Sequence, residues 1–223
     1  MKKIHLVELV SDHLASDMPD DMISQFHPEI IKSALNVAYN QAVYLTWMNG
    51  KKFSDYSQLD AWTRTYRIAL TEPVVTATAV SGNLRLPYPP MQLPNNMGIR
   101  QVALAASETI AFAYMENTAL AIFSQLDVHS IDTTPYFRLE QNDSGAGIAS
   151  HILKVGKIPI AYNAAPLNVD IKMIVPLDQV GDYDDIAIPA GQEDMLVKQT
   201  VEFLRTKLPE DGVNDLNANR PNQ

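Results

Sequence analysis

Apolar residues recur at helical spacing in the first third of the chain. In the first segment they are separated by three or four positions, at Ile4, Val7, Val10 and Leu14, and Leu6 and Leu9 widen the stripe. This pattern predicts a helix over residues 4–16. Proline and paired aspartates then predict a turn over residues 17–21.

A longer helix is predicted over residues 28–49. Pro28 and Glu29 suit its first turn, where an N–H is not needed and a negative charge is favoured. Asn49-Gly50 predicts its end, because glycine readily adopts the left-handed conformation that follows a helix. The predicted apolar face with its flanks consists of Ile30, Ile31, Ala34, Leu35, Ala38, Ala42, Val43, Leu45 and Trp47.

A third helix is predicted over residues 53–69, where aromatic and aliphatic residues again recur at spacings of three and four. From Pro73 the pattern changes to β-branched and alternating residues. Turns are predicted at 81–83, 95–98 and 156–157. The predicted strands cover residues 74–80, 84–87, 91–94, 99–102, 110–115, 136–139, 152–155, 158–162 and 169–175, with a short helix at 116–126.

The chain then returns to helical spacing. The last helix begins near residue 191, with a buried stripe formed by Leu196, Val197, Thr200, Phe203 and Leu204. We therefore predict an α+β protein: a helical region over 1–72, a central antiparallel β-sandwich or barrel-like sheet over 73–190, and a C-terminal helix over 191–208 packing on the N-terminal helices. The polar residues 209–223 form an extended tail, and the whole is one compact unit.

Composition narrows the possible functions. The chain has 223 residues, a net charge of −9 and no cysteine, which excludes disulfides, thiolate zinc sites and cysteine nucleophiles and suits a reducing cytosol. Most of the negative charge lies after residue 126, which argues against sequence-specific DNA binding. The first residues do not form a signal peptide, and no apolar run is long enough for a membrane span.

The histidines do not form a metal-binding pattern. They occur at His5, His13, His27, His129 and His151, and no pair has the spacing of a helical zinc motif. The acidic loop 178–185 is the best candidate for a cation site. Its glycine precedes the aspartates and a closing glutamate is missing, so a solvated loop or an interface patch is the favoured interpretation.

Other catalytic motifs are also missing from the sequence. Residues 142–147 contain Gly-x-Gly without the third glycine or a P-loop lysine, and a hairpin tip is favoured there. No Gly-x-Ser-x-Gly elbow occurs. We therefore expect no enzymatic activity, no catalytic residues, no metal and no cofactor.

The aromatic residues of the first third permit two interpretations. They are Tyr39, Tyr44, Trp47, Phe53, Tyr56, Trp62 and Tyr66. Few basic residues accompany them, so a nucleic-acid stacking platform is not expected. The residues either pack in the core of the chain or are buried against a neighbouring subunit.

Several motifs, in this order and spacing, resemble a family of head-to-tail connector proteins of crAss-like and related short-tailed phages of gut Bacteroidales. They are His27-Pro28-Glu29-Ile30, Ala38-Tyr39-Asn40-Gln41, Leu84-Arg85-Leu86-Pro87, Gln92-Leu93-Pro94-Asn95, Gly98-Ile99-Arg100, Val169-Asp170-Ile171-Lys172-Met173-Ile174 and Pro209-Glu210-Asp211-Gly212-Val213-Asn214-Asp215. The resemblance spans most of the chain and is weakest over 103–165.

The resemblance implies a virion structural protein of the neck or tail, made in the host cytoplasm. Such a protein forms a homo-oligomeric ring of twelve copies, comparable to a tail adapter. It contacts the portal and the neighbouring neck or tail ring proteins, and encloses DNA without sequence-specific binding during genome ejection. The tail 209–223 is then expected to order on an adjacent ring.

An alternative from a different class stays open. A monomeric β-sandwich binding module would recognise a carbohydrate or protein ligand through its loops, for example 141–147 and 178–190. These loops contain Tyr183 as their only aromatic residue. A ring would be recognised by its mass, whereas a module of this kind would remain a monomer.

Overall fold

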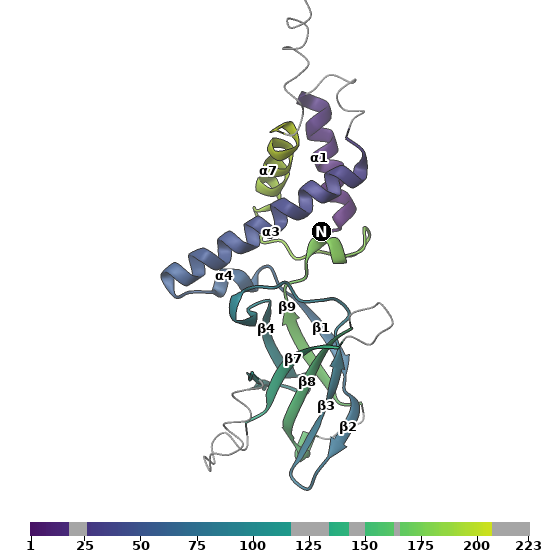
Figure 1. Cartoon of the computed structure of the whole chain (residues 1–223), viewed down its shortest axis with the longest axis vertical. Coiled ribbons are helices and arrows are strands. Elements are labelled where there is room, and N and C mark those ends of the chain that lie inside the picture. The colour runs from purple at the N-terminus through teal and green to yellow at the C-terminus, as the bar shows by residue number, and fades with distance from the viewer. Residues whose placement is uncertain (18–25, 117–133, 143–149, 163–165, 207–223) are drawn as a thin grey trace, which may run out of the picture. The chain divides into compact units, whose positions relative to one another are not determined.

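Along the chain, helices come before and after a central β-region (Figure 1). The computed structural model describes residues 1–17, 26–116, 134–142, 150–162 and 166–206. It divides into two compact units, one formed by Met1–Ala61 together with the chain from Val180 onward, and one formed by Trp62–Gln179. The predicted short helix at 116–126, most of the 141–147 loop and the tail 209–223 lie outside the described residues.

The helical unit contains α1 (Lys3–Asp17), α3 (Pro28–Phe53), α4 (Ser57–Asp60) and α7 (Glu193–Thr206). α7 packs against both α1 and α3 (Figure 1). The helices predicted at 4–16, 28–49 and from 191 are confirmed. Their apolar stripes form the core of this unit, with fully buried side chains at Leu6, Val10, Leu35, Val43 and Leu196.

α3 begins where the sequence predicts and ends later. At its start the His27 Nδ1 atom accepts a hydrogen bond from the Glu29 backbone N–H, 3.3 Å away. The predicted end at Gly50 is wrong, because the helix continues to Phe53 and Ser54 takes the left-handed cap with φ 54°. Gly50 is instead needed for space: a Cβ there would lie 2.7 Å from Tyr56 Cδ1 and 2.8 Å from the Asp55 carbonyl oxygen.

The third helix predicted over 53–69 is wrong. After the last residue of α3, only Ser57–Asp60 is helical there, and β1 (Arg64–Ala69) begins four residues later. Exposure along β1 alternates at every second residue, which is the period of a strand with one covered face. The prediction failed because the alternation in β1 directly follows residues with helical spacing, and the two patterns together resemble one helix.

The second unit contains two sheets. β1, β9 (Asn168–Met173), β4 (Ile99–Leu104) and β5 (Ser107–Ala111) form a four-stranded sheet in that order. The five-stranded sheet has the order β2 (Thr71–Val75), β3 (Ala79–Arg85), β8 (Ser150–Pro159), β7 (Tyr136–Asn142) and β6 (Ala113–Tyr114). Every pairing is antiparallel except β6 with β7. The predicted α+β class with a central, largely antiparallel β-region is confirmed.

Alternating residues of both sheets form the core of this unit. β9 buries Val169, Ile171 and Met173 completely, as its strict alternation predicts. The five-stranded sheet contributes Val80, Leu84, Leu153 and Ile158, all without exposed surface. The prolines of 87–94 keep that stretch out of the ladders, although Met91 and Leu93 are buried.

Two predicted turns are wrong because they lie inside strands. Residues 81–83 belong to β3, and the chain reverses before them, where the Thr76 backbone N–H donates to the Ala79 carbonyl at 2.8 Å. Residues 156–157 lie inside β8, where Lys157 has φ 58° and the register with β3 shifts. Both sites are irregularities in a ladder, which a sequence pattern does not distinguish from a hairpin turn.

Candidate functional site

The histidines lie apart from one another. His5 and His13 are exposed on α1, His27 caps α3, and His151 lies on β8. His129 lies outside the described residues. Within the part of the chain that the structure describes, no three histidine or acidic side chains come together in a way that could hold a metal ion.

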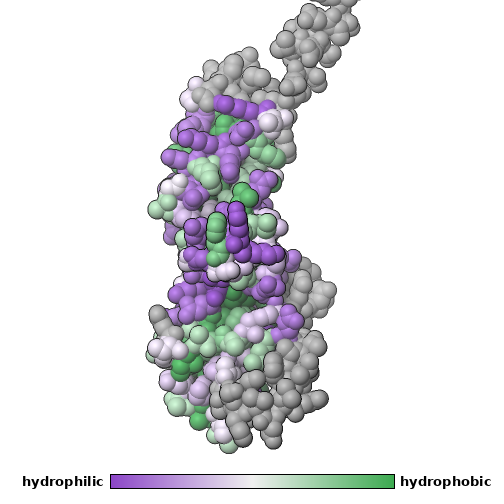
Figure 2. Space-filling view, turned by 90° about the vertical axis from the view of Figure 1, so that its left-hand side faces the viewer, coloured by the Kyte–Doolittle hydropathy of each residue, from purple (hydrophilic) through white to green (hydrophobic). Residues whose placement is uncertain are grey.

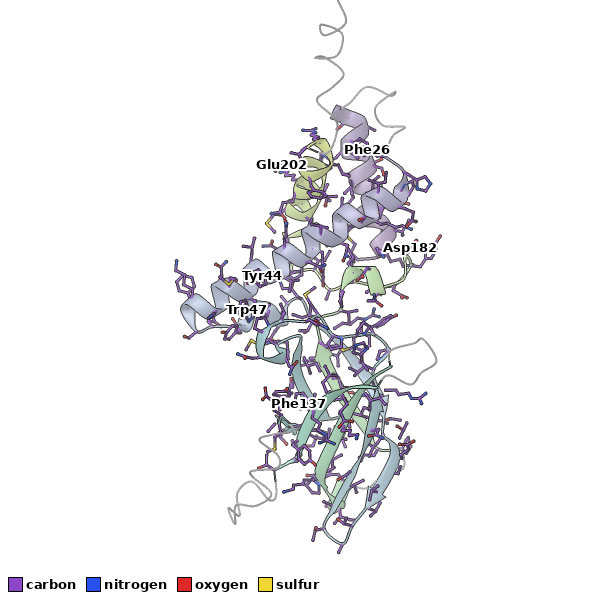
Figure 3. The ribbon with its side chains drawn as sticks, in the orientation of Figure 1. Phe26, Tyr44, Trp47, Phe137, Asp182 and Glu202 are labelled. Carbon is purple, nitrogen blue, oxygen red and sulfur yellow. The ribbon has the colours of Figure 1, made fainter. Side chains whose placement is uncertain are left out.

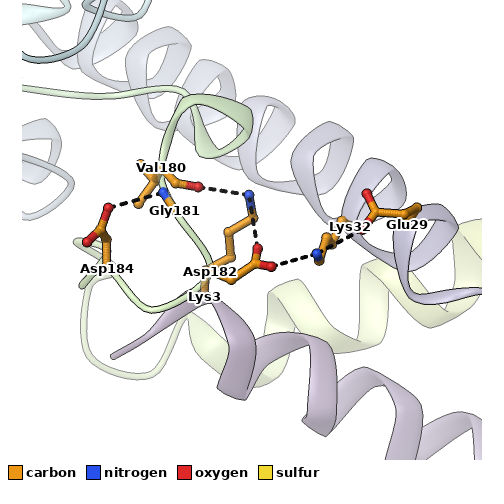
Figure 4. Close-up of polar contacts among 7 residues, drawn as sticks. All are labelled: Lys3, Glu29, Lys32, Val180, Gly181, Asp182 and Asp184. Atoms are coloured by element: carbon orange, nitrogen blue, oxygen red, sulfur yellow. Dashed lines mark hydrogen bonds and ion pairs between the residues drawn. The ribbon is translucent and has the colours of Figure 1, made fainter.

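The acidic loop 178–185 ties parts of the helical unit together (Figure 4). The Asp182 carboxylate accepts a hydrogen bond from Lys32 Nζ on α3 at 2.7 Å, and Lys3 Nζ of α1 lies 3.9 Å from its other oxygen. Lys3 is buried and donates to the Val180 carbonyl at 3.0 Å. Asp184 accepts from the Gly181 backbone N–H at 3.2 Å. Asp182 and Asp184 are thus engaged by the fold itself.

These contacts shift two pKa values in opposite directions. The hydrogen bond from Lys32, followed by the charges of Lys32 and Lys3, lowers the pKa of Asp182. The hydrogen bonds to Asp182 and Glu29 raise the pKa of Lys32. Both shifts favour the charged forms, so this group acts as a clasp between α1, α3 and the chain that enters α7. We refer to Lys3, Lys32 and Asp182 as the clasp.

The loop 178–190 therefore belongs to the helical unit from Val180 onward, not to a sandwich. Backbone pairing adds to the clasp, because the Ile4 N–H donates to Asp182 at 2.9 Å and the Ile186 N–H donates to Met1 at 2.8 Å. The sequence suggested a sandwich loop here. The pairing of this loop with the first residues of the chain is a long-range contact, which the sequence pattern does not show. Tyr183 of this loop is 77% exposed.

A hollow of about 200 Å³ lies in the sheet unit. It is lined by Tyr114, Met115, Glu116, Arg138 and Leu139. Arg138 forms an ion pair with Glu140 at 2.7 Å, and Lys154 contacts the other oxygen of the same carboxylate at 2.7 Å. The Arg138 side chain that lines this hollow is thus already paired with a carboxylate of the same strand.

The aromatic residues of the first third divide between core and surface. Tyr39, Trp47 and Trp62 are 2%, 5% and 2% exposed, so core packing is correct for them. Tyr44 and Phe53 are 49% and 71% exposed. The rings of Tyr44 and Trp47 are in contact, with their centroids 5.5 Å apart. Both residues lie on the half of α3 that extends beyond α1 and α7 (Figure 3).

An apolar surface follows this half of α3. Met48 is four residues from Tyr44 and three from Leu45, so its side chain neighbours both on the helix surface. Tyr44, Leu45 and Met48 are 49%, 55% and 44% exposed. We call these three residues the α3 apolar face. Leu45, which the sequence assigns to the apolar face or its flanks, is exposed, as is Ile30 (46% exposed) at the other end of the helix. The apolar arc of α3 is wider than its own unit covers.

Two lysines border the α3 apolar face. Lys51 Nζ lies 5.6 Å from the centroid of the Trp47 ring, and Lys52 Nζ lies 5.4 Å from that of Phe53. Cations are attracted to ring faces and to the negative end of a helix. The surface of the helical unit seen from this side mixes apolar patches with strongly polar residues (Figure 2).

No protein-family model matches this chain, and no curated protein matches it either. Among the described helices, none combines the length and the apolar character that crossing a membrane requires. Among the surfaces described above, the α3 apolar face with its basic border has the composition of a binding surface. Clustered tyrosine, leucine and methionine side chains with adjacent charges can bind another protein surface.

Proposed function

We propose that this chain is a virion structural protein of a short-tailed phage. In this role it is a subunit of the head-to-tail connector ring that joins the portal to the tail and encloses the DNA passage. It is not an enzyme in this role. The resemblance over 27–41, 84–100, 169–174 and 209–215 supports the proposal, as does the α+β fold with helices at both ends.

The observation that carries the proposal is the exposure of large apolar side chains on α3. Five of the twelve exposed large apolar residues in the described chain belong to this one helix: Ile30, Tyr44, Leu45, Met48 and Phe53. Single apolar residues on a surface are ordinary, but three neighbouring ones, as in the α3 apolar face, are typical of a protein interface. Repeated subunit contacts in a ring require such a surface on every copy.

The acidic character of the chain is compatible with this role. A net charge of −9 repels phosphates, so DNA would pass such a ring without adhering to it. Copies of the chain would be held together by protein contacts. The neighbouring partners would be the portal on one side and a neck or tail ring protein on the other.

The proposal is tested by the mass and shape of the purified full-length chain. Light scattering and negative-stain imaging are carried out on the chain alone and mixed with the portal protein encoded by the same genome. Closed rings of one size, alone or on the portal, are the expected result. A chain that stays monomeric and does not bind the portal protein at concentrations of hundreds of micromolar would contradict the proposal. That outcome would favour the monomeric module for a carbohydrate or protein ligand, with Tyr183 as the first residue to examine.

A further inference from the structure

The exposed face of α1 differs from that of α3. His5, Glu8, Leu9, Asp12 and His13 are all exposed and occupy one side of α1, opposite its buried residues. Leu9, which widens the apolar stripe of this helix, is 40% exposed. It lies between Glu8 and Asp12, one turn of helix apart. We call Glu8, Leu9 and Asp12 the α1 acidic face.

The two faces are complementary in charge and in chemistry. The α3 apolar face has two positive charges at its border, on Lys51 and Lys52, and the α1 acidic face has two negative charges around an exposed leucine. Neither face is used by the unit to which it belongs. α1 and the end of α3 lie on opposite sides of the helical unit (Figure 1). One chain cannot bring them together, whereas two copies can.

We propose that the α3 apolar face of one copy packs against the α1 acidic face of the next copy. Tyr44, Leu45 and Met48 would enclose Leu9, and Lys51 and Lys52 would lie opposite Glu8 and Asp12. This inference rests on the proposed ring and names the surfaces that join its subunits. Two different faces on opposite sides of one unit form a head-to-tail contact, the type that repeats around a closed ring.

Charge reversal tests the contact with two variants. K51E/K52E makes both faces acidic, and E8K/D12K makes both faces basic. Alone, each variant places like charges opposite one another, and we expect its subunits to associate roughly thirtyfold more weakly at low salt. An equimolar mixture has attractive contacts throughout if the two variants alternate around a ring with an even number of subunits. We therefore expect the mixture, and the chain that combines all four substitutions, to assemble again.

The measurement is the fraction of chain in rings, by light scattering and imaging, in whichever condition gives rings with the wild-type chain. K172E/K198E is a control matched in charge change, because Lys172 and Lys198 are exposed and lie outside both faces. This control should assemble as the wild type does. Rescue in the mixture also excludes misfolding, because misfolded subunits would not complement one another.

The outcomes separate this inference from the proposed function. If the wild type and both reversed variants form rings equally well, the α3–α1 contact is wrong and the ring stands. If each variant alone loses rings and the mixture does not recover them, the pairing of these two faces is wrong. If the wild type forms no ring alone or on the portal, the proposed function itself fails, and this contact fails with it.

Discussion

At the scale of single residues, the same substitution should have different effects at a buried and at an exposed position of α3. Ala38 is 3% exposed, and Gln41, one turn further along the same helix, is exposed. We predict that Ala38→Asp lowers the free energy of unfolding by about 3–5 kcal/mol, because it buries an unpaired charge. Gln41→Asp is the control and should change it by less than about 0.5 kcal/mol. Urea unfolding measures both, and equal effects would show that α3 does not bury this side.

Gly98 provides a second residue-scale test, in the sheet unit. A Cβ atom at this position would lie 2.0 Å from the Met91 carbonyl oxygen, and backbone cannot move aside as a flexible side chain can. We predict that Gly98→Ala lowers the free energy of unfolding by about 3 kcal/mol or more. At Gly191, φ is 84° and a Cβ would meet nothing within 4 Å. Gly191→Ala should lower it by only about 1 kcal/mol.

The clasp has a pH dependence whose sign follows from its two shifted pKa values. The pKa of Asp182 is lower in the folded state, so its stabilisation is present above the unfolded value near 3.8 and is lost as the pH falls through the folded pKa. The pKa of Lys32 is higher in the folded state, so its contribution is present below 10.5 and is lost as the pH rises through the folded pKa. The pair therefore stabilises the fold between these limits.

We predict that Asp182→Asn is less stable than the wild type at pH 7 and that the difference shrinks below about pH 4. Thermal or urea unfolding at a series of pH values measures it. Asp178→Asn is a suitable control, because Asp178 is exposed and its nearest partner is the neighbouring Gln179, 3.3 Å away. A difference that persists unchanged at pH 3 would show that the charge of Asp182 is not what stabilises the clasp.

At the scale of elements, hydrophobic periodicity predicted the amphipathic helices and strands but not the irregular segments. α1, α3, α7 and β9 each bury a residue stripe that repeats at the period of their own backbone, so the sequence was sufficient. β1 was missed because its alternation directly follows a four-residue helix. Gly82 and Gly156 resemble turn residues in the sequence but lie within long strands, since only pairing with distant strands determines where a chain reverses.

The candidate surfaces were predictable only in part. For Tyr44 the sequence left open core packing or burial against a neighbouring subunit, and it assigned Leu45 and Leu9 only to apolar stripes or their flanks. A helix that is apolar over too wide an arc must leave some of these residues exposed, and that width is visible in the sequence. Which side remains uncovered depends on how α1 and α7 pack against α3. The clasp was not predictable, because Lys3, Lys32 and Asp182 lie far apart along the chain.

At the scale of the whole molecule, the proposed ring and the proposed contact make one further expectation testable. Surface ion pairs weaken as salt screens them, and the Debye length falls from about 10 Å at 0.1 M to about 3 Å at 1 M. If Lys51 and Lys52 face Glu8 and Asp12 of the next copy, the dissociation constant between copies should rise with salt. In the combined four-substitution chain it should rise in the same way. A dissociation constant that falls as salt is added to the wild type would show a purely apolar contact.

The division of the chain into units has a consequence for its synthesis. The helical unit is discontinuous: α1 and α3 are translated first, and α7 follows only after the entire sheet unit of Trp62–Gln179. At about 5–20 residues per second, the ribosome needs on the order of ten seconds to add the segment between them. During this time the α3 side chains destined for α7 have no permanent cover. The sheet unit is therefore synthesised while α1 and α3 still lack α7, so their apolar side chains stay partly uncovered. Chaperones that bind exposed apolar segments would have their greatest effect at this stage.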